Sequence, residues 1–273
     1  MREKAWKAGR GKTGTWKEEA PENQKRPSAA RGEWSILMLF SRGVIYKLLL
    51  LLAAMAAVQT TLFCLVYRAG MRLEDTMRGY SLEYVLACSR VEWVCGIGFL
   101  LLTVILCLQG CEFSSKSHYT MGRLSVSESR ISWLRSGFHC CCYFLFLAMQ
   151  VLILYGICRL YLWMIAADGY DVIGDQTIML AFWRSPFLHS LLPVGESSRM
   201  LRNLLLIAAL GFGSARVPDC QRSGQRCIAI IILTGLTLLF FCDEMGNRNM
   251  DLLACRVLAV ILAGVIVRKG VFK

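Results

Sequence analysis

The sequence predicts an all-α fold: a polytopic integral membrane protein with about six transmembrane helices and with both termini in the cytoplasm. Three observations support this prediction. Of the 273 residues, 56% are hydrophobic and only 18% are charged, whereas soluble domains carry about 25% charged residues. Apolar runs close to the length of a bilayer span follow one another through most of the chain. The Lys and Arg residues collect on alternate sides of these runs.

The chain begins with a basic, polar stretch. Residues 1–33 hold too little apolar surface to offset the entropy of ordering, so we expect a disordered cytoplasmic tail. If translation starts at Met38 instead, this tail is a start-site artefact. Residues 34–40 are apolar and aromatic and end at a Ser-Arg-Gly break, which predicts a short interfacial helix on the cytoplasmic leaflet. The transmembrane domain then covers residues 34–273.

The six expected spans are residues 48–67, 91–108, 138–166, 200–215, 227–242 and 252–267. The last three are short for a bilayer core of about 30 Å, so tilted or partly re-entrant segments are alternatives for them. One side of this arrangement holds 21 Lys and Arg residues and the other holds eight, and the side with the excess is cytoplasmic. The net charge of +12 therefore fits orientation in a membrane, which we expect to be the bacterial plasma membrane, rather than nucleic-acid binding.

An apolar segment between the third and fourth spans is interrupted. Residues 176–192 have the apolar mass of a span, but Pro186 in their middle lacks a backbone donor and breaks a helix. We expect two short helices that dip into the outer leaflet or lie on it. A seventh span is the alternative, but it would move the carboxyl terminus outside and remove the charge asymmetry.

Few polar residues fall inside the spans, and none of them is an acid or a histidine at mid-depth. Ionisable residues inside a membrane usually mark catalysis or ion coupling, so the sequence predicts no enzyme and no catalytic residues. The 13 cysteines form no CxxC pair and the three histidines stand far apart, so we expect no metal site and no cofactor. Gln59, Gln150 and Thr234 are polar groups that can line a membrane pathway or bond neighbouring helices.

The loop between the second and third spans, residues 112–137, is larger than a connection requires. Its stretch from Ser125 to Glu128 has the Ser-x-x-Glu pattern that is typical of a helix start. The residues that follow predict a short amphipathic helix that carries Arg130 and Arg135. Such a helix either docks a soluble partner or anchors the third span at the interface.

This loop resembles the cytoplasmic loop of the type-two ABC exporter permeases. In that family, two apolar spans are followed by an acidic residue, a threonine, a leucine and a Val/Ile-Ser step, and then by a Ser- and Arg-rich helix that enters the third span. The residues in matching order are Glu112, Thr120, Leu124, Val126, Ser127, Glu128, Arg130 and Ile131, while Ser125 stands where the family commonly has proline. The expected order of an interfacial helix and six spans, without an ATP-binding motif, also resembles the family.

The resemblance implies a permease subunit of an ATP-binding-cassette exporter. A separate ATPase subunit would grip the 112–137 loop and rock the spans between inward-open and outward-open states. Its implied partners are that ATPase, a second copy or a related permease in a homodimer or heterodimer, and membrane lipid. The coupling residues would be Glu112, Arg123, Glu128, Arg130 and Arg135, and the path would be lined by Gln59, Gln150 and Thr234. The alternative is a stand-alone membrane assembly, interaction or regulatory protein without transport activity.

Overall fold

The computed structural model describes residues 29–73, 82–109, 128–167, 176–193, 195–222, 224–225, 227–242 and 248–271. Within these ranges all regular secondary structure is α-helical, as the sequence predicts. The expected tail up to residue 28 and residues 112–127 of the expected coupling loop lie outside the described residues.

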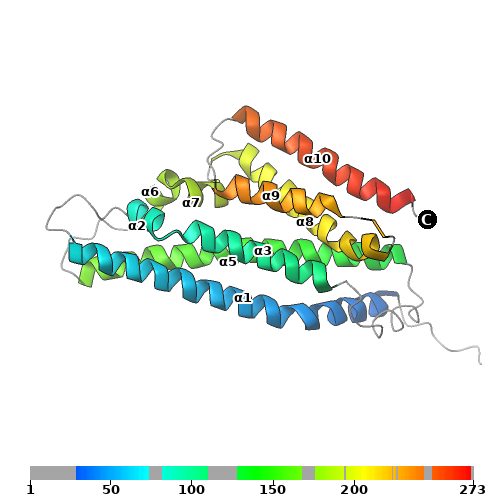
Figure 1. Cartoon of the computed structure of the whole chain (residues 1–273), viewed down its shortest axis with the longest axis horizontal. Helices are drawn as coiled ribbons and strands as arrows, with labels where there is room; N and C mark the ends of the chain where they lie inside the picture. The colour runs from blue at the N-terminus through cyan, green and yellow to red at the C-terminus, as the bar shows by residue number, and fades with distance from the viewer. Residues whose placement is uncertain are drawn as a thin grey trace, which may run out of the picture.

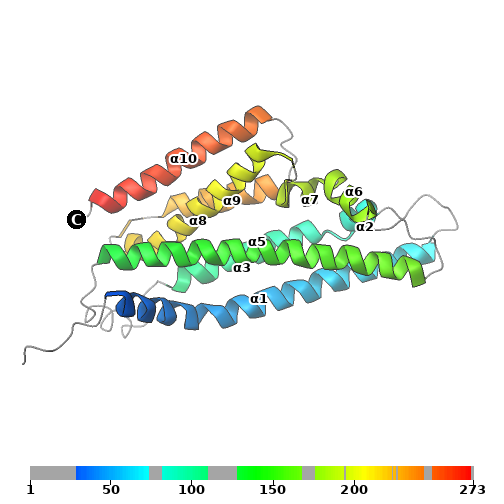
Figure 2. The same ribbon diagram turned by 180° about the vertical axis from the view of Figure 1, so that it is seen from behind.

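Six long helices form one elongated bundle. They are α1 (Ala29–Leu73), α3 (Val91–Gln109), α5 (Glu128–Ala167), α8 (Ser197–Arg222), α9 (Ile228–Cys242) and α10 (Arg248–Val271). Successive long helices run in opposite directions, so that the start of α1 and the end of α10 lie at the same end of the bundle (Figures 1 and 2). We call this the terminal end of the bundle.

The opposite end of the bundle carries three short helices. These are α2 (Leu82–Cys88), α6 (Gln176–Arg184) and α7 (Pro186–Leu191), and they lie together beside the far ends of α1 and α5 (Figure 1). We call this the capped end. The short helix α2 falls in a segment that the sequence indicated only as an outer loop.

Five of the long helices are long and apolar enough to cross a membrane, which makes the chain a multi-pass membrane protein by length and composition. The expectation of six such spans is therefore met only in part. The apolar stretch of the remaining long helix, α9, covers only Ile228–Phe240, which at 1.5 Å per residue is roughly 20 Å, short of a core of about 30 Å. Packing beside α3 and α8 holds α9 in the bundle despite this length.

The structure corrects two boundaries at the terminal end. Residues 29–40, expected as disordered tail and then as a separate interfacial helix, belong to the single 45-residue helix α1. The expected break fails because Ser41 and Gly43 are tolerated inside a helix: the Ser41 Oγ donates a hydrogen bond to the Met38 carbonyl at 3.0 Å, and one helical glycine costs only about 1 kcal/mol. Likewise, residues 128–137 are not loop but the first turns of the 40-residue helix α5.

The interrupted segment 176–192 forms two short helices, which confirms that part of the expectation. Helix α6 ends at Arg184, and Pro186 occupies the first turn of α7. Pro186 has no backbone N–H to bond the preceding turn, and a first helical turn is the position that tolerates this loss. The break turns the chain so that α7 packs against α6 and α9.

Among the described residues, two apolar clusters and two close helix contacts at glycines hold the bundle together. One cluster joins α1, α3, α5, α8, α9 and α10, and the other joins the capped end of α1 and α5 to α2, α6 and α7. Glycines bring helix pairs together: a Cβ on Gly98 would overlap the Met55 side chain of α1, and a Cβ on Gly211 would overlap Cys140 of α5. Small residues at such contacts are typical of helix packing in membranes.

Candidate functional site

Of the five sequence-predicted coupling residues, only Arg130 and Arg135 have side chains that the structure describes, and these two differ in exposure. Glu112 and Arg123 lie outside the described residues, and the side chain of Glu128, the first residue of α5, is not described. Arg130 is exposed on the first turn of α5. Arg135 is buried instead, with its Nη1 3.9 Å from Oδ1 of Asp219 in α8, so it belongs to the contact between α5 and α8.

Of the three residues expected to line a pathway, Gln59 and Gln150 lie together, whereas Thr234 bonds within its own helix. Gln59 and Gln150 are fully buried and bonded to each other across α1 and α5, with the Gln59 Nε2 donating to the Gln150 Oε1 at 3.1 Å. Thr234 of α9 donates its hydroxyl to the Ile230 carbonyl of its own helix at 2.7 Å. Gln59 and Thr234 therefore serve helix pairing and local backbone bonding, and only Gln150 also reaches a pocket.

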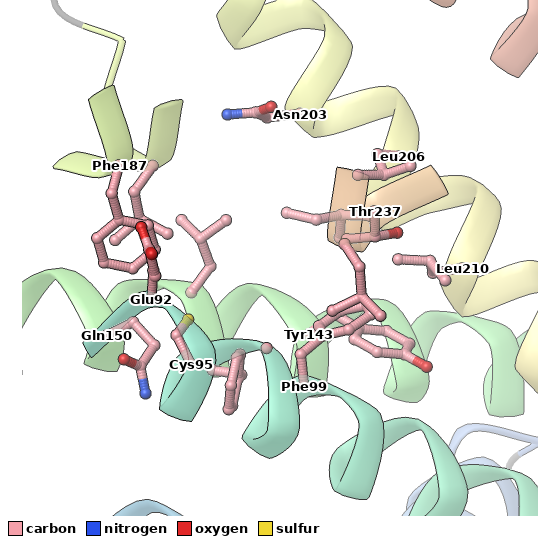
Figure 3. A pocket seen from close by; sticks show the side chains of 16 residues that line it. Glu92, Cys95, Phe99, Tyr143, Gln150, Phe187, Asn203, Leu206, Leu210 and Thr237 are labelled. Atoms are coloured by element: carbon pink, nitrogen blue, oxygen red, sulfur yellow. The ribbon is translucent and has the colours of Figure 1, made fainter. Parts of the chain in front are cut away.

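That pocket lies between α3, α5, α7, α8 and α9 and contains about 570 Å³ of space, part of it open to the surroundings. Its wall is mostly aliphatic and aromatic: Phe99, Tyr143, Phe146 and Phe187 contribute rings, and Leu206 and Leu210 face them from α8 (Figure 3). Small-molecule sites are usually lined by hydrophobic and aromatic side chains with a few polar groups. The fold therefore contains a candidate pocket that no sequence pattern indicated.

A few polar groups are set into this apolar wall. Glu92, in the first turn of α3, is the one charged residue among the described residues that line the pocket, and Gln150, Asn203 and Thr237 supply the uncharged polar groups. Figure 3 shows the Glu92 carboxylate beside the Phe187 ring at one side of the space. An apolar cavity with a few placed polar groups can bind and orient a lipophilic ligand.

A buried charged cluster joins α8 to α10 close to this pocket. The Arg202 Nη1 lies 2.6 Å from Oδ1 of Asp251, and the Arg199 Nε lies 3.3 Å from Oδ2 of the same carboxylate. Arg202 and Asp251 are only 3% and 1% exposed, and the Arg202 guanidinium also stands 4.7 Å from the centre of the Phe240 ring. The Arg199 Nε also lies 2.6 Å from Oε2 of Glu196, so the two guanidinium groups face two carboxylates, as burial in a membrane protein requires.

This cluster was not predicted from the sequence. One signal was available. Arg199 and Arg202 are three residues apart and therefore share a helix face, so they need an acidic partner once that face is buried. The partner lies 49 residues further along the chain, which no local pattern identifies.

The terminal half of the contact between α5 and α8 carries a further polar pair. His139 and Ser214 are both fully buried, and the His139 Nδ1 lies 2.8 Å from the Ser214 Oγ. Nearby, the Tyr143 hydroxyl donates to Thr103 Oγ1 of α3 at 3.2 Å. These hydrogen bonds connect α5 with α8 and with α3, and the same three helices supply walls of the pocket.

Among the described residues, no group of three or more His, Cys, Asp or Glu side chains is placed to hold a metal ion. No protein-family model matches the chain, and no curated protein or solved structure is significantly similar to it. The function is therefore inferred from the sequence and the geometry described above.

Proposed function

We propose that the chain is the permease subunit of an ATP-binding-cassette exporter, coupled to a separate ATPase and located in the bacterial plasma membrane. The resemblance of the 112–137 loop to that of type-two permeases supports this proposal. The pocket between α3, α5, α7, α8 and α9 supplies the place for a transported molecule. A second permease copy, or a related chain, completes the membrane pathway.

The observation that carries the proposal is the length of α5. Its 40 residues extend about 60 Å at 1.5 Å per residue, which is about twice the bilayer core of about 30 Å. The helix must therefore project beyond the membrane. Its first turn, with exposed Ser129 and Arg130, lies at the terminal end, which the excess of basic residues assigns to the cytoplasm.

The contacts of α5 supply a route from an ATPase to the pocket. A force on the first turn of α5 would pass to α8 through the ion pair of Arg135 with Asp219 and the bond between His139 and Ser214. Both helices then continue into the pocket wall, α5 with Tyr143 to Gln150 and α8 with Asn203 to Leu210. In this mechanism Arg135 transmits movement and does not touch the ATPase.

The test is recovery of an ATPase with the purified permease. The proposal predicts that an ATP-binding-cassette protein is encoded beside this chain, and that protein is the probe, co-expressed with the chain and captured through a tag on the permease. Replacing Glu128 and Arg130 together with Ala should lower ATPase recovery at least fivefold, while expression and membrane insertion persist, because an exposed charge such as that of Arg130 contributes little to stability.

The matched control is Arg184→Ala, which removes an exposed charge at the capped end, where Arg184 lies 4.0 Å from Glu83. This variant should recover the ATPase like the wild type. Equal recovery with the Glu128 and Arg130 variant, together with unchanged ATP-dependent transport, would contradict the proposal. The stand-alone assembly or regulatory protein would then be the better account.

A further inference from the structure

We propose that the pocket between α3, α5, α7, α8 and α9 binds a lipophilic cation, with the positive charge at Glu92 and the apolar body between the aromatic rings. The identification of this ligand as the exported substrate rests on the proposed function. Binding itself does not, because it depends only on the walls of the pocket.

The interior of the pocket favours an apolar, aromatic ligand body. Phe99 lies at the centre of a ring cluster, with its ring centroid 5.7 Å from that of Tyr143 and 6.3 Å from that of Phe146. The opposite wall is aliphatic, from Leu206 to Leu210 of α8. Water gains few hydrogen bonds on such surfaces, so a lipophilic group displaces it favourably.

The charged residue in the pocket wall determines whether a cationic or an anionic ligand is favoured. Glu92 is the one charged residue of the described lining, and the ion pairs formed within the described ranges do not include it. Arg199 and Arg202, on the helix that supplies Asn203 to the pocket wall, are matched by Asp251. A cation beside Glu92 therefore gains an ion pair, whereas an anion is repelled.

The aromatic ring beside Glu92 adds to this selectivity. Phe187 of α7 and Glu92 lie side by side at the same edge of the pocket (Figure 3), and both are partly exposed. Ring faces attract cations, most strongly where water is excluded. Because these two residues are partly exposed, a ligand can enter the pocket from the surroundings at this edge. The ring cluster around Phe99 is buried and gives no such access.

A structural role for Glu92 has a different signature. A carboxylate in the first turn of a helix stabilises it by interaction with the backbone dipole, and Glu92 occupies that position in α3. A role limited to the helix would make the Glu92→Gln variant less stable but would leave the preference between cations and anions unchanged. The comparison of two ligands with opposite charge separates the two roles.

The experiment measures binding of tritiated tetraphenylphosphonium to the purified full chain in an uncharged detergent, by equilibrium dialysis. Tetraphenylborate has nearly the same shape and the opposite charge, so it serves as the matched ligand. The wild type should bind the cation at least tenfold more tightly than the anion. Glu92→Gln should weaken cation binding about tenfold and leave anion binding equal or tighter.

Two further variants complete the design. Glu83→Gln removes a carboxylate of α2 that lies at the same end of the bundle but outside the pocket, and it should bind both ligands like the wild type. Phe187→Leu keeps the apolar volume but removes the ring, and it should weaken cation binding about threefold. Phe187 is only half-buried, so this variant keeps the test available if Glu92→Gln does not fold.

Equal binding of the two ligands by the wild type, or an equal loss of both in Glu92→Gln, would overturn the proposal. Cation binding unaffected by Phe187→Leu would remove the ring from the site. Because no ATPase is present, failure here leaves the exporter proposal intact, and failure of ATPase recovery leaves this binding result intact.

Discussion

At the scale of single residues, the buried polar side chains act mainly in pairs that join one helix to another. Arg202 and Asp251 join α8 to α10, Gln59 and Gln150 join α1 to α5, and His139 and Ser214 join α5 to α8. In an apolar environment an unpaired member of such a pair is costly. The pairs therefore fix which helix faces meet.

Asp251→Asn should destabilise the protein strongly. The substitution leaves the buried guanidinium of Arg202 without its countercharge, and loss of one member of a buried ion pair costs about 3–5 kcal/mol. At about 2–4 °C per kcal/mol, the melting temperature of the detergent-solubilised protein should fall by roughly 6 °C or more. The control Glu83→Gln, which breaks a largely exposed contact with Arg184 at 4.0 Å, should shift it by less than about 2 °C. Similar shifts for both variants would show that the Asp251 pair is not buried as described.

The glutamine pair allows a double-mutant cycle. Gln59→Leu or Gln150→Leu alone leaves a buried amide without its partner and should cost about 1–2 kcal/mol. The double variant should recover much of that loss, because neither polar group remains. Additive losses in melting temperature would show that the two amides act independently, as they would if each lined a hydrated pathway.

Most of the residues that form the candidate pocket could not be predicted from the sequence. Gln150 was identified as a polar group of interest, and the pocket includes it. Glu92 was not, because a carboxylate at a predicted span end is ordinary in any sequence. Its significance depends on α9, which packs beside α3, and on α7, which packs beside α9. These positions are tertiary facts without a local pattern.

At the scale of elements, apolar content predicted the long helices well and their ends poorly. Five of the six expected spans are contained in a helix of the structure, and the span 227–242 begins one residue before α9. Helices α1 and α5 continue far beyond the apolar cores, to 45 and 40 residues. The cause is physical. A polar or small residue such as Ser41 ends the apolar signal without ending the backbone hydrogen bonds, and a helix ends only where those bonds or its packing are lost.

The contact between α5 and α8 depends on the small side chain of Gly211. A Cβ at this position would overlap the Cys140 side chain and lie 2.9 Å from its backbone nitrogen, so a side-chain rotation alone cannot relieve the contact. Gly211→Ala should therefore cost about 1–3 kcal/mol through overpacking, measured as a lower melting temperature.

The matched control for that prediction is Gly156→Ala in α5, where a Cβ meets nothing within 4 Å. Alanine is the better helix former by about 1 kcal/mol, so this variant should melt at the same or a higher temperature. If Gly211→Ala melts like Gly156→Ala, α5 and α8 do not approach as closely as the structure describes.

At the scale of the whole molecule, the account depends on the direction in which each helix crosses the membrane. The antiparallel order of the long helices places the start of α1, the start of α5 and the end of α10 at one end of the bundle (Figures 1 and 2). A cytoplasmic ATPase can reach α5 only if this end faces the cytoplasm. The number of times the chain crosses the membrane depends on α9, because its apolar stretch is shorter than those of the five other long helices.

The most direct test of this central claim is the accessibility of two introduced cysteines that flank α9. Gln225 is exposed between α8 and α9, and Gly246 lies between α9 and α10 in the sequence. In a background without the 13 native cysteines, intact cells are treated with a membrane-impermeant thiol reagent. If α9 crosses the membrane with the terminal end inside, Gly246→Cys is labelled in intact cells and Gln225→Cys only after permeabilisation. Equal labelling of both positions would show that α9 does not cross, and labelling of Gln225→Cys alone would place the terminal end outside, so either result would contradict the account.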